Sequence, residues 1–211
     1  MTYADLKNSA EYEEIAELNH DDLKKFIIRE SSGNNGWALI AKMYQGADLL
    51  LFGFLLMKAF IPFMRSHATE NLIGMGWGIL FSFTVLIVTH ELIHYLAYLA
   101  VGARKLSFGM KLRKFIFYVQ ADKQVMNYKQ MKIVALAPAV VVVLASGIVA
   151  MLNFETPIYY FCLTIFAVHS LFCGGDLGLL CFFENRNEDE IVTFDDVEAG
   201  VTKFYRKKKD N

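Results

Sequence analysis

Residues 83–101 read FTVLIVTHELIHYLAYLAV. Apolar residues fill both ends of this stretch, whereas His90, Glu91 and His94 form a polar group in its middle. The full apolar stretch, residues 72–101, is long enough to cross a bilayer as a helix, which takes about 20 residues. Ionisable side chains are costly at that depth and usually mark a function. The stretch therefore predicts a membrane helix that carries a functional site.

The spacing of His90, Glu91 and His94 suits a metal ion. Residues four apart share one helix face, so the two histidines can present their nitrogens to a single ion. Zinc accepts such nitrogens and, in a catalytic site, takes three protein ligands and one water. Zinc lowers the pKa of that water toward about 7, and Glu91 can take its proton and pass it to a leaving amine. Two histidines making ordinary hydrogen bonds are the alternative, which their apolar surroundings disfavour.

A third zinc ligand has to lie at the same depth, and the other apolar stretches contain three candidates, Asp48, His169 and Asp176. His94 and Asp176 each lie seven residues before the end of their stretch, which is roughly 10 Å below the membrane surface in a helix. Asp176 is therefore the expected ligand. His169 lies about 10 Å deeper on the same face, so it is expected to be a polar neighbour, and a ligand role stays open.

Four apolar stretches set the fold class of this 211-residue chain, in which 55% of residues are hydrophobic. They cover about residues 49–64 (with an alternative start near 37), 72–101, 133–152 and 157–183. We expect a mainly α, polytopic membrane protein with about four transmembrane helices. Lys58 lies in the first stretch and is expected to extend to the headgroups. Residues 105–122 are aromatic, β-branched and partly alternating, which predicts a short β-hairpin between the second and third helices.

Loop charge predicts the orientation in the membrane. Lysine and arginine crowd residues 104–132 and 203–209, whereas the loop at 65–71 has one arginine and the loop at 153–156 has none. The basic segments are expected to face the cytoplasm, and four crossings then place both termini there. The polar, acidic N-terminus lacks the pattern of a cleavable signal peptide. The chain is therefore expected to be an integral membrane protein.

Three regions follow from these patterns. Residues 1–46 are expected to form a cytoplasmic amphipathic region, residues 47–184 a transmembrane core that carries the zinc motif and the β segment 105–122, and residues 185–211 a charged cytoplasmic tail. In the first region apolar residues recur at roughly helical spacing, which suggests short amphipathic helices; they are Tyr12, Ile15, Leu18, Leu23, Phe26 and Ile27.

Several polar residues are expected to have no role in chemistry. His20 and His67 lie in polar flanks and are read as solvated. The acidic residues after the fourth stretch are read as a solvated segment, although one could supply a ligand; they are Glu184, Glu188, Asp189, Glu190, Asp195 and Asp196. Cys162, Cys173 and Cys181 are an odd number in apolar sequence, which favours small buried residues over disulfides. No nucleic-acid-binding pattern is present, since the basic residues border apolar segments.

These residues resemble a family. His90-Glu91-Leu92-Ile93-His94 in a membrane helix, the β segment ending Phe117-Tyr118-Val119-Gln120-Ala121, Ala135-Leu136-Ala137-Pro138, and Gly174-Gly175-Asp176-Leu177 are similar to a bacterial family of zincin-type membrane peptidases. That family is itself similar to the site-2 intramembrane zinc metalloproteases. The resemblance covers about residues 72–183.

The resemblance implies a three-helix catalytic core preceded by an extra helix. It implies zinc held by His90, His94 and Asp176, with Glu91 as the catalytic base and the β segment as an edge that docks an extended substrate. One feature departs from the site-2 proteases, which carry an asparagine three residues after the equivalent proline. Here Pro138 precedes Ala-Val-Val-Val, so the residue that would stabilise the oxyanion is not identified.

The leading function is a zinc-dependent endopeptidase that cleaves an intramembrane or juxtamembrane segment, with a membrane protein or peptide as substrate and the lipid bilayer as its surroundings. The alternative is a metal-binding membrane protein without peptidase activity that binds a partner segment. Glu91 favours the enzyme, because a purely structural site has no use for an adjacent base. A transporter subunit is less favoured, because one would expect more spans or repeats. The oligomeric state is not predicted.

Overall fold

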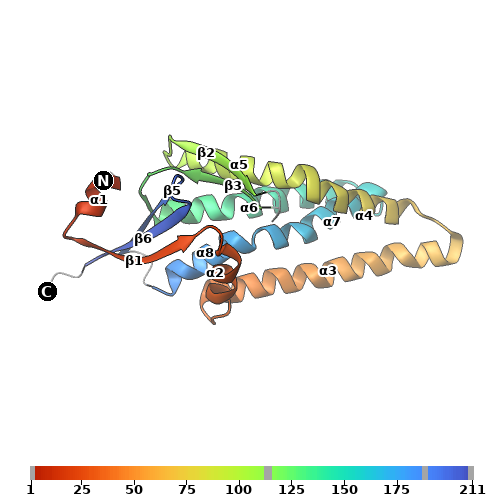
Figure 1. Ribbon diagram of the computed structural model, residues 1–211. Coiled ribbons are helices and arrows are strands. Elements are labelled where there is room, and N and C mark those ends of the chain that lie inside the picture. The colour runs from red at the N-terminus through yellow and green to blue at the C-terminus, as the bar shows by residue number, and fades with distance from the viewer. Residues whose placement is uncertain (1–2, 112–115, 187–189, 209–211) are drawn as a thin grey trace. The chain divides into compact units, whose positions relative to one another are not determined.

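The computed structural model describes residues 3–111, 116–186 and 190–208. The described chain is mainly helical, as expected (Figure 1). Three helical runs are long and apolar enough to cross a membrane: α3 (Gly36–Ser66); α4 (Glu70–Phe81) continuing through the π-helical turn η1 (Ser82–Leu86) into α5 (Ile87–Ala100); and α6 (Tyr128–Leu152). The fourth expected helix is a bent pair, α7 (Pro157–Phe172) and α8 (Gly174–Glu184), so the described residues contain three candidate spans, or four if this pair counts as one.

The remaining elements are two short helices and six strands. They are α1 (Tyr3–Asn8), β1 (Tyr12–Asn19), α2 (Leu23–Ser31), β2 (Leu106–Lys111), β3 (Ile116–Ala121), β4 (Met126–Asn127), β5 (Ile191–Asp196) and β6 (Val201–Lys207).

The chain divides into two compact units. The first unit comprises Met1–Leu39, Glu91–Ala137 and Gly175–Asn211, and the second comprises Ile40–His90 and Pro138–Gly174.

The second unit is helical, and α4 and α7 pack closely within it. Glycine permits this approach, because a Cβ at Gly78 would lie 2.8 Å from the carbonyl oxygen of Phe161 and from the side chain of Thr164. Gly74 lies against the backbone of Pro157 in the same way. Small residues that let backbones approach are typical of helix pairs in membranes.

Lys58 of α3 has a partner within the second unit. Its Nζ lies 2.7 Å from the carboxylate of Glu155, which lies between α6 and α7. The sequence predicted that this lysine extends toward headgroups. The Glu155 carboxylate compensates the charge of Lys58, and both side chains stay partly exposed.

A four-stranded antiparallel sheet in the order β1-β6-β5-β4 belongs to the first unit (Figure 1). The expected amphipathic helix over residues 12–19 is wrong, because β1 pairs with β6 there. Opposite charges accompany the pairing: Nζ of Lys203 on β6 lies 3.0 Å from the carboxylate of Glu14 and 2.8 Å from that of Glu17, both on β1. The helix expected for Leu23, Phe26 and Ile27 is present as α2.

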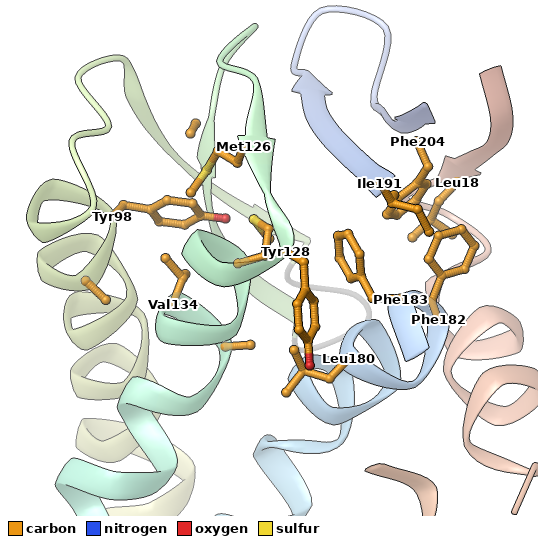
Figure 2. Packing of buried hydrophobic residues seen from close by; sticks show 14 of the residues in the cluster. Leu18, Tyr98, Met126, Tyr128, Val134, Leu180, Phe182, Phe183, Ile191 and Phe204 are labelled. Atoms are coloured by element: carbon orange, nitrogen blue, oxygen red, sulfur yellow. The ribbon is translucent and has the colours of Figure 1, made fainter. Parts of the chain in front are cut away.

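Aromatic side chains form the centre of the first unit. Figure 2 shows Phe182 and Phe183 of α8 beside Phe204 of β6, and the ring centroids of Phe182 and Phe204 are 4.1 Å apart. All three side chains are fully buried. Tyr98 of α5 and Val134 of α6 belong to the same cluster. This core fixes α8 against the sheet, which matters for the site because α8 carries Asp176.

The acidic residues after the fourth stretch were expected to be solvated, and for three of them this is wrong: Asp196 is buried, and Glu184 and Asp195 are partly buried and hydrogen-bonded. The Glu184 carboxylate accepts hydrogen bonds from the backbone N–H groups of Gly36 and Trp37, which satisfies donors at the start of α3. The carboxyl of Asp195 is enclosed and accepts a 2.6 Å hydrogen bond from the Thr202 hydroxyl. Residues 187–189 lie outside the described residues.

Strands β2 and β3 form a separate two-stranded antiparallel sheet, in which Phe108 lies opposite Val119. They come from the segment expected to form a hairpin, and residues 112–115 between them lie outside the described residues. The rings of Tyr95 on α5 and Phe108 on β2 stack at 5.2 Å, so the sheet is held against α5 within the first unit.

The close approach of α4 and α7 can be tested with two glycines on one helix. Gly78→Ala should lower the free energy of unfolding by about 1–3 kcal/mol, because the added methyl group meets backbone and a buried side chain. Gly76→Ala is the matched control: nothing lies within 4 Å of its Cβ position. Alanine there should leave stability unchanged or raise it by up to about 1 kcal/mol. Equal effects of both substitutions in thermal unfolding would contradict this packing.

The enclosed Asp195 predicts a pH dependence of stability. Burial raises its pKa to about 6, although the hydrogen bonds from Thr202, Ala121 and Gln120 oppose the shift. Between its ordinary pKa of 3.8 and about 6, the folded protein holds a proton that the unfolded chain has released. The free energy of unfolding therefore falls as pH rises through this window.

Asp195→Asn should remove that fall, because the amide does not ionise and still accepts the Thr202 hydrogen bond. The variant should be more stable than the wild type at pH 7, by up to about 3 kcal/mol. Denaturant unfolding of both proteins from pH 4 to 7 measures the difference. Parallel pH profiles would show that Asp195 does not carry the dependence.

Candidate metal centre

Helix α5 positions His90, Glu91 and His94 (Figure 1). Apolar residues on both sides continue the helix, and the two histidines lie one turn apart on one face. They are only 5% and 8% exposed, whereas Leu92 is 49% exposed and Leu96 is 55% exposed. The helix thus turns its polar face inward and its apolar face outward, which is the arrangement that suits a lipid environment.

Both ring nitrogens of His94 have partners within the first unit. Nδ1 donates a 3.0 Å hydrogen bond to the backbone carbonyl of Val134 on α6, since a carbonyl oxygen can only accept. Nε2 lies 3.2 Å from Oδ1 of Asp176. A neutral ring with its proton on Nδ1 carries a lone pair on Nε2, so two acceptors face each other. Such a pair needs a proton or a metal cation between its atoms.

Asp176 lies in the first turn of α8, which begins at Gly174. The sequence predicted this residue at the depth of His94, and the structure brings the two side chains into contact. Close packing of α8 on α2 allows it: a Cβ at Gly178 would lie 3.2 Å from the backbone of Ile27. The position of the Asp176 carboxylate thus depends on contacts made by the N-terminal region.

His90 has a different set of neighbours, within the second unit. Its Nδ1 lies 3.0 Å from Nε2 of His169 on α7. Sγ of Cys173 lies 3.6 Å from Nδ1 of His169 and 4.0 Å from its Nε2. The three side chains are buried, and their possible ligand atoms lie within 4.8 Å of one another. His169, expected to be a polar neighbour of the site, is therefore in direct contact with His90.

Glu91 faces β3 in the first unit. Its carboxylate accepts a hydrogen bond from the backbone N–H of Val119. Val119 lies opposite Phe108 of β2, so β3 uses its outer edge for this contact. The candidate base and the outer edge of a strand therefore lie side by side.

Three contacts were not predicted from the sequence. The Val134 carbonyl is a backbone group, so no residue type signals it. Cys173 is buried as expected, and it also contacts His169, which the spacing of four residues could have indicated. His20, expected to be solvated, hydrogen-bonds Thr202 at 3.0 Å and joins the polar network around Asp195. His67 is exposed.

The side chains on α5 and α8 fit zinc. Imidazole nitrogens and a carboxylate oxygen are the ligands that zinc takes in catalytic sites. A metal-bound histidine usually donates its second ring N–H to a carbonyl, carboxylate or similar acceptor, as His94 does to Val134. Asp48, the other acidic candidate, is 3% exposed on α3, and among the described residues it joins no group of three metal-binding side chains.

Comparison with known proteins agrees with this chemistry. Searches of curated proteins and of solved structures gave no match. Residues 83–189, just over half of the chain, match the model of a family, DUF3267, described as "Putative zincin peptidase". The matched residues include His90, Glu91, His94 and Asp176. The chain therefore belongs to this zincin peptidase family, whose description indicates zinc metallopeptidase activity.

Proposed function

We propose that this protein is a zinc-dependent endopeptidase of the membrane, similar to the site-2 proteases, that cleaves an intramembrane or juxtamembrane segment. The observation that carries the proposal is the contact of His94 with both Val134 and Asp176. In a neutral His94 ring, these contacts leave the lone pair of Nε2 opposite the Asp176 carboxylate. His90 lies one turn earlier on the same helix face. We assign His90, His94 and Asp176 as zinc ligands, and the family description supports zinc.

Glu91 is the proposed general base. Zinc, when bound, acts as a Lewis acid that activates a water and polarises a peptide carbonyl. The Glu91 carboxylate takes a proton from the attacking water and delivers it to the nitrogen of the leaving amine. The Val119 N–H holds this carboxylate toward β3.

The substrate is proposed to bind as an extended strand along the outer edge of β3. An extended segment near lipid has to pair its backbone N–H and C=O groups, and strand addition does this. The hydrogen bond between Val119 and Glu91 supports the assignment, because a strand bound along this edge would lie beside Glu91, the proposed base. A membrane protein or peptide is therefore the proposed substrate class.

The proposed location is a bacterial inner membrane, with both termini in the cytoplasm. Support comes from the basic residues of 104–132 and 203–209, which are expected on the cytoplasmic side. The sheet that joins the N-terminal β1 to the C-terminal β6 agrees with this, since it requires both ends of the chain on one side.

One observation favours the alternative, a metal-binding membrane protein that holds a partner segment without cleaving it. Pro138 lies buried within α6 and is followed by Ala-Val-Val-Val, which offers no polar side chain for an oxyanion. The same ligands and the same strand edge would serve such a protein. Glu91 distinguishes the two functions, because only the enzyme needs a base.

The role of Glu91 is tested by Glu91→Gln. Zinc content should stay at the wild-type level, whereas cleavage should be lost, because the amide cannot accept the proton. Metal analysis of purified protein, together with a proteomic comparison of membrane fragments from wild-type and variant cells, measures both. Glu70→Gln, an exposed change at the start of α4, is the control and should leave both unchanged. Unchanged cleavage in Glu91→Gln would refute the base, and fragment patterns equal in all strains would favour the alternative.

The third ligand is tested by Asp176→Ala, which should reduce zinc per chain well below the wild-type value. Asp48→Ala provides a matched control, because it also removes a buried acidic side chain from an apolar helix. Zinc per chain, measured after gel filtration, should be preserved in this control. Stoichiometric zinc in Asp176→Ala would show that the ligand is misassigned.

A further inference from the structure

We infer that His169 is a positioning residue: it holds His90 in the tautomer that binds a metal, through a hydrogen-bonded chain that ends at Cys173. The inference rests on the proposed zinc site. Its basis is the set of contacts among His90, His169 and Cys173, all within the second unit.

The first link of the chain is the 3.0 Å contact between Nδ1 of His90 and Nε2 of His169. A hydrogen bond between two neutral imidazoles needs one proton, which belongs to one ring or the other. If His90 donates from Nδ1, its Nε2 carries the lone pair that a metal requires. If His169 donates instead, the proton of His90 lies on Nε2, and the ring cannot bind a metal through that atom.

The second link is compatible with both directions, because a thiol can donate through its S–H or accept at sulfur. Sγ of Cys173 lies nearer to Nδ1 of His169 than to Nε2, at 3.6 Å against 4.0 Å. When His169 accepts at Nε2, its proton lies on Nδ1 and can be donated to the sulfur. A zinc ion on Nε2 of His90 selects the first direction, and the contact with Cys173 permits it, because both links then run from His90 to His169 and on to Cys173.

Burial makes this selection effective. His169 is fully buried, and His90 and Cys173 are 5% and 1% exposed. Water cannot readily replace a hydrogen bond in such surroundings, so the tautomer of His90 is set by its protein neighbour. A ring that must first change tautomer binds a metal less tightly, and loss of a partner of this kind typically costs 10–100-fold in affinity.

The same three side chains could instead bind the metal themselves, since histidine nitrogens and a cysteine sulfur are ordinary zinc ligands. In that arrangement the nitrogens of His90 and His169 that lie 3.0 Å apart would both face the ion. The test therefore has to separate a positioning role from a ligand role.

Two pairs of variants do so, with zinc affinity measured by chelator competition on the full chain in detergent. His169→Leu should weaken zinc binding about 10–100-fold. His169→Gln should restore affinity to within about threefold of wild type, because its Oε1 replaces Nε2 as acceptor. His169→Asn, equally polar but too short to reach His90, should behave like His169→Leu. Thr164→Val, which removes a buried hydroxyl from the same helix, should leave affinity unchanged.

Cobalt substitution tests the role of the thiol. Cys173→Ser keeps an acceptor for His169 and should bind metal nearly as well as the wild type. The cobalt-loaded wild type should show no thiolate-to-metal charge-transfer band, and Cys162→Ser on the same helix is the control. A charge-transfer band that disappears in Cys173→Ser, with zinc lost in His169→Gln, would make these residues ligands and overturn the positioning role.

The remaining outcomes are separable. If zinc binding depends on His90 but His169→Leu binds as tightly as wild type, the zinc site stands and the positioning role fails. A wild-type protein that binds no zinc would overturn both. Circular dichroism and gel filtration of each variant identify misfolded protein, and the Gln and Asn pair carries the test if His169→Leu does not fold.

Discussion

The carbonyl oxygen of Val134 accepts a hydrogen bond from Nδ1 of His94, and it cannot donate one. This constraint places one ring proton on Nδ1, so a neutral His94 ring carries its lone pair on Nε2. Nε2 lies 3.2 Å from the Asp176 carboxylate, so a lone pair and a negative charge then face each other. A cation is the natural complement. The inferred hydrogen bond to His169 would likewise place the proton of His90 on Nδ1. For His90 the acceptor is a side chain, whereas for His94 it is a backbone carbonyl.

Asp176 reaches this point because of contacts far from it in sequence. Helix α8 is held by the buried cluster of Phe182, Phe183 and Phe204, and Phe204 lies on β6. Strand β6 in turn pairs with β1, where lysine and glutamate charges meet. The polar ends of the chain, which look like solvated flanks, thus build the sheet on which α8 rests. The position of a proposed metal ligand inside an apolar helix therefore depends on packing in the polar region of the chain.

Much of the site was predictable because its signals are local. The spacing of His90 and His94 follows from helix geometry, and the apolar residues around them indicate a membrane helix. The depth argument for Asp176 also used only helix rise and the ends of apolar stretches. The strand β1 was not predictable in this way. Residues 12–19 have apolar residues at roughly helical spacing, and only the partner strand β6 favours an extended conformation.

The sequence by itself determined the mainly helical class, the apolar spans and the pairing of two histidines with an adjacent glutamate. These depend on periodicity and spacing within single elements, which the order of residues fixes. Tertiary structure alone decided that the Val134 carbonyl orients His94, that Cys173 contacts His169, that Glu91 binds β3, and that the chain ends pair in a sheet. Each of these joins groups on different elements or uses a backbone atom. Such contacts are set by packing and by the need to satisfy buried polar groups, which no local pattern records.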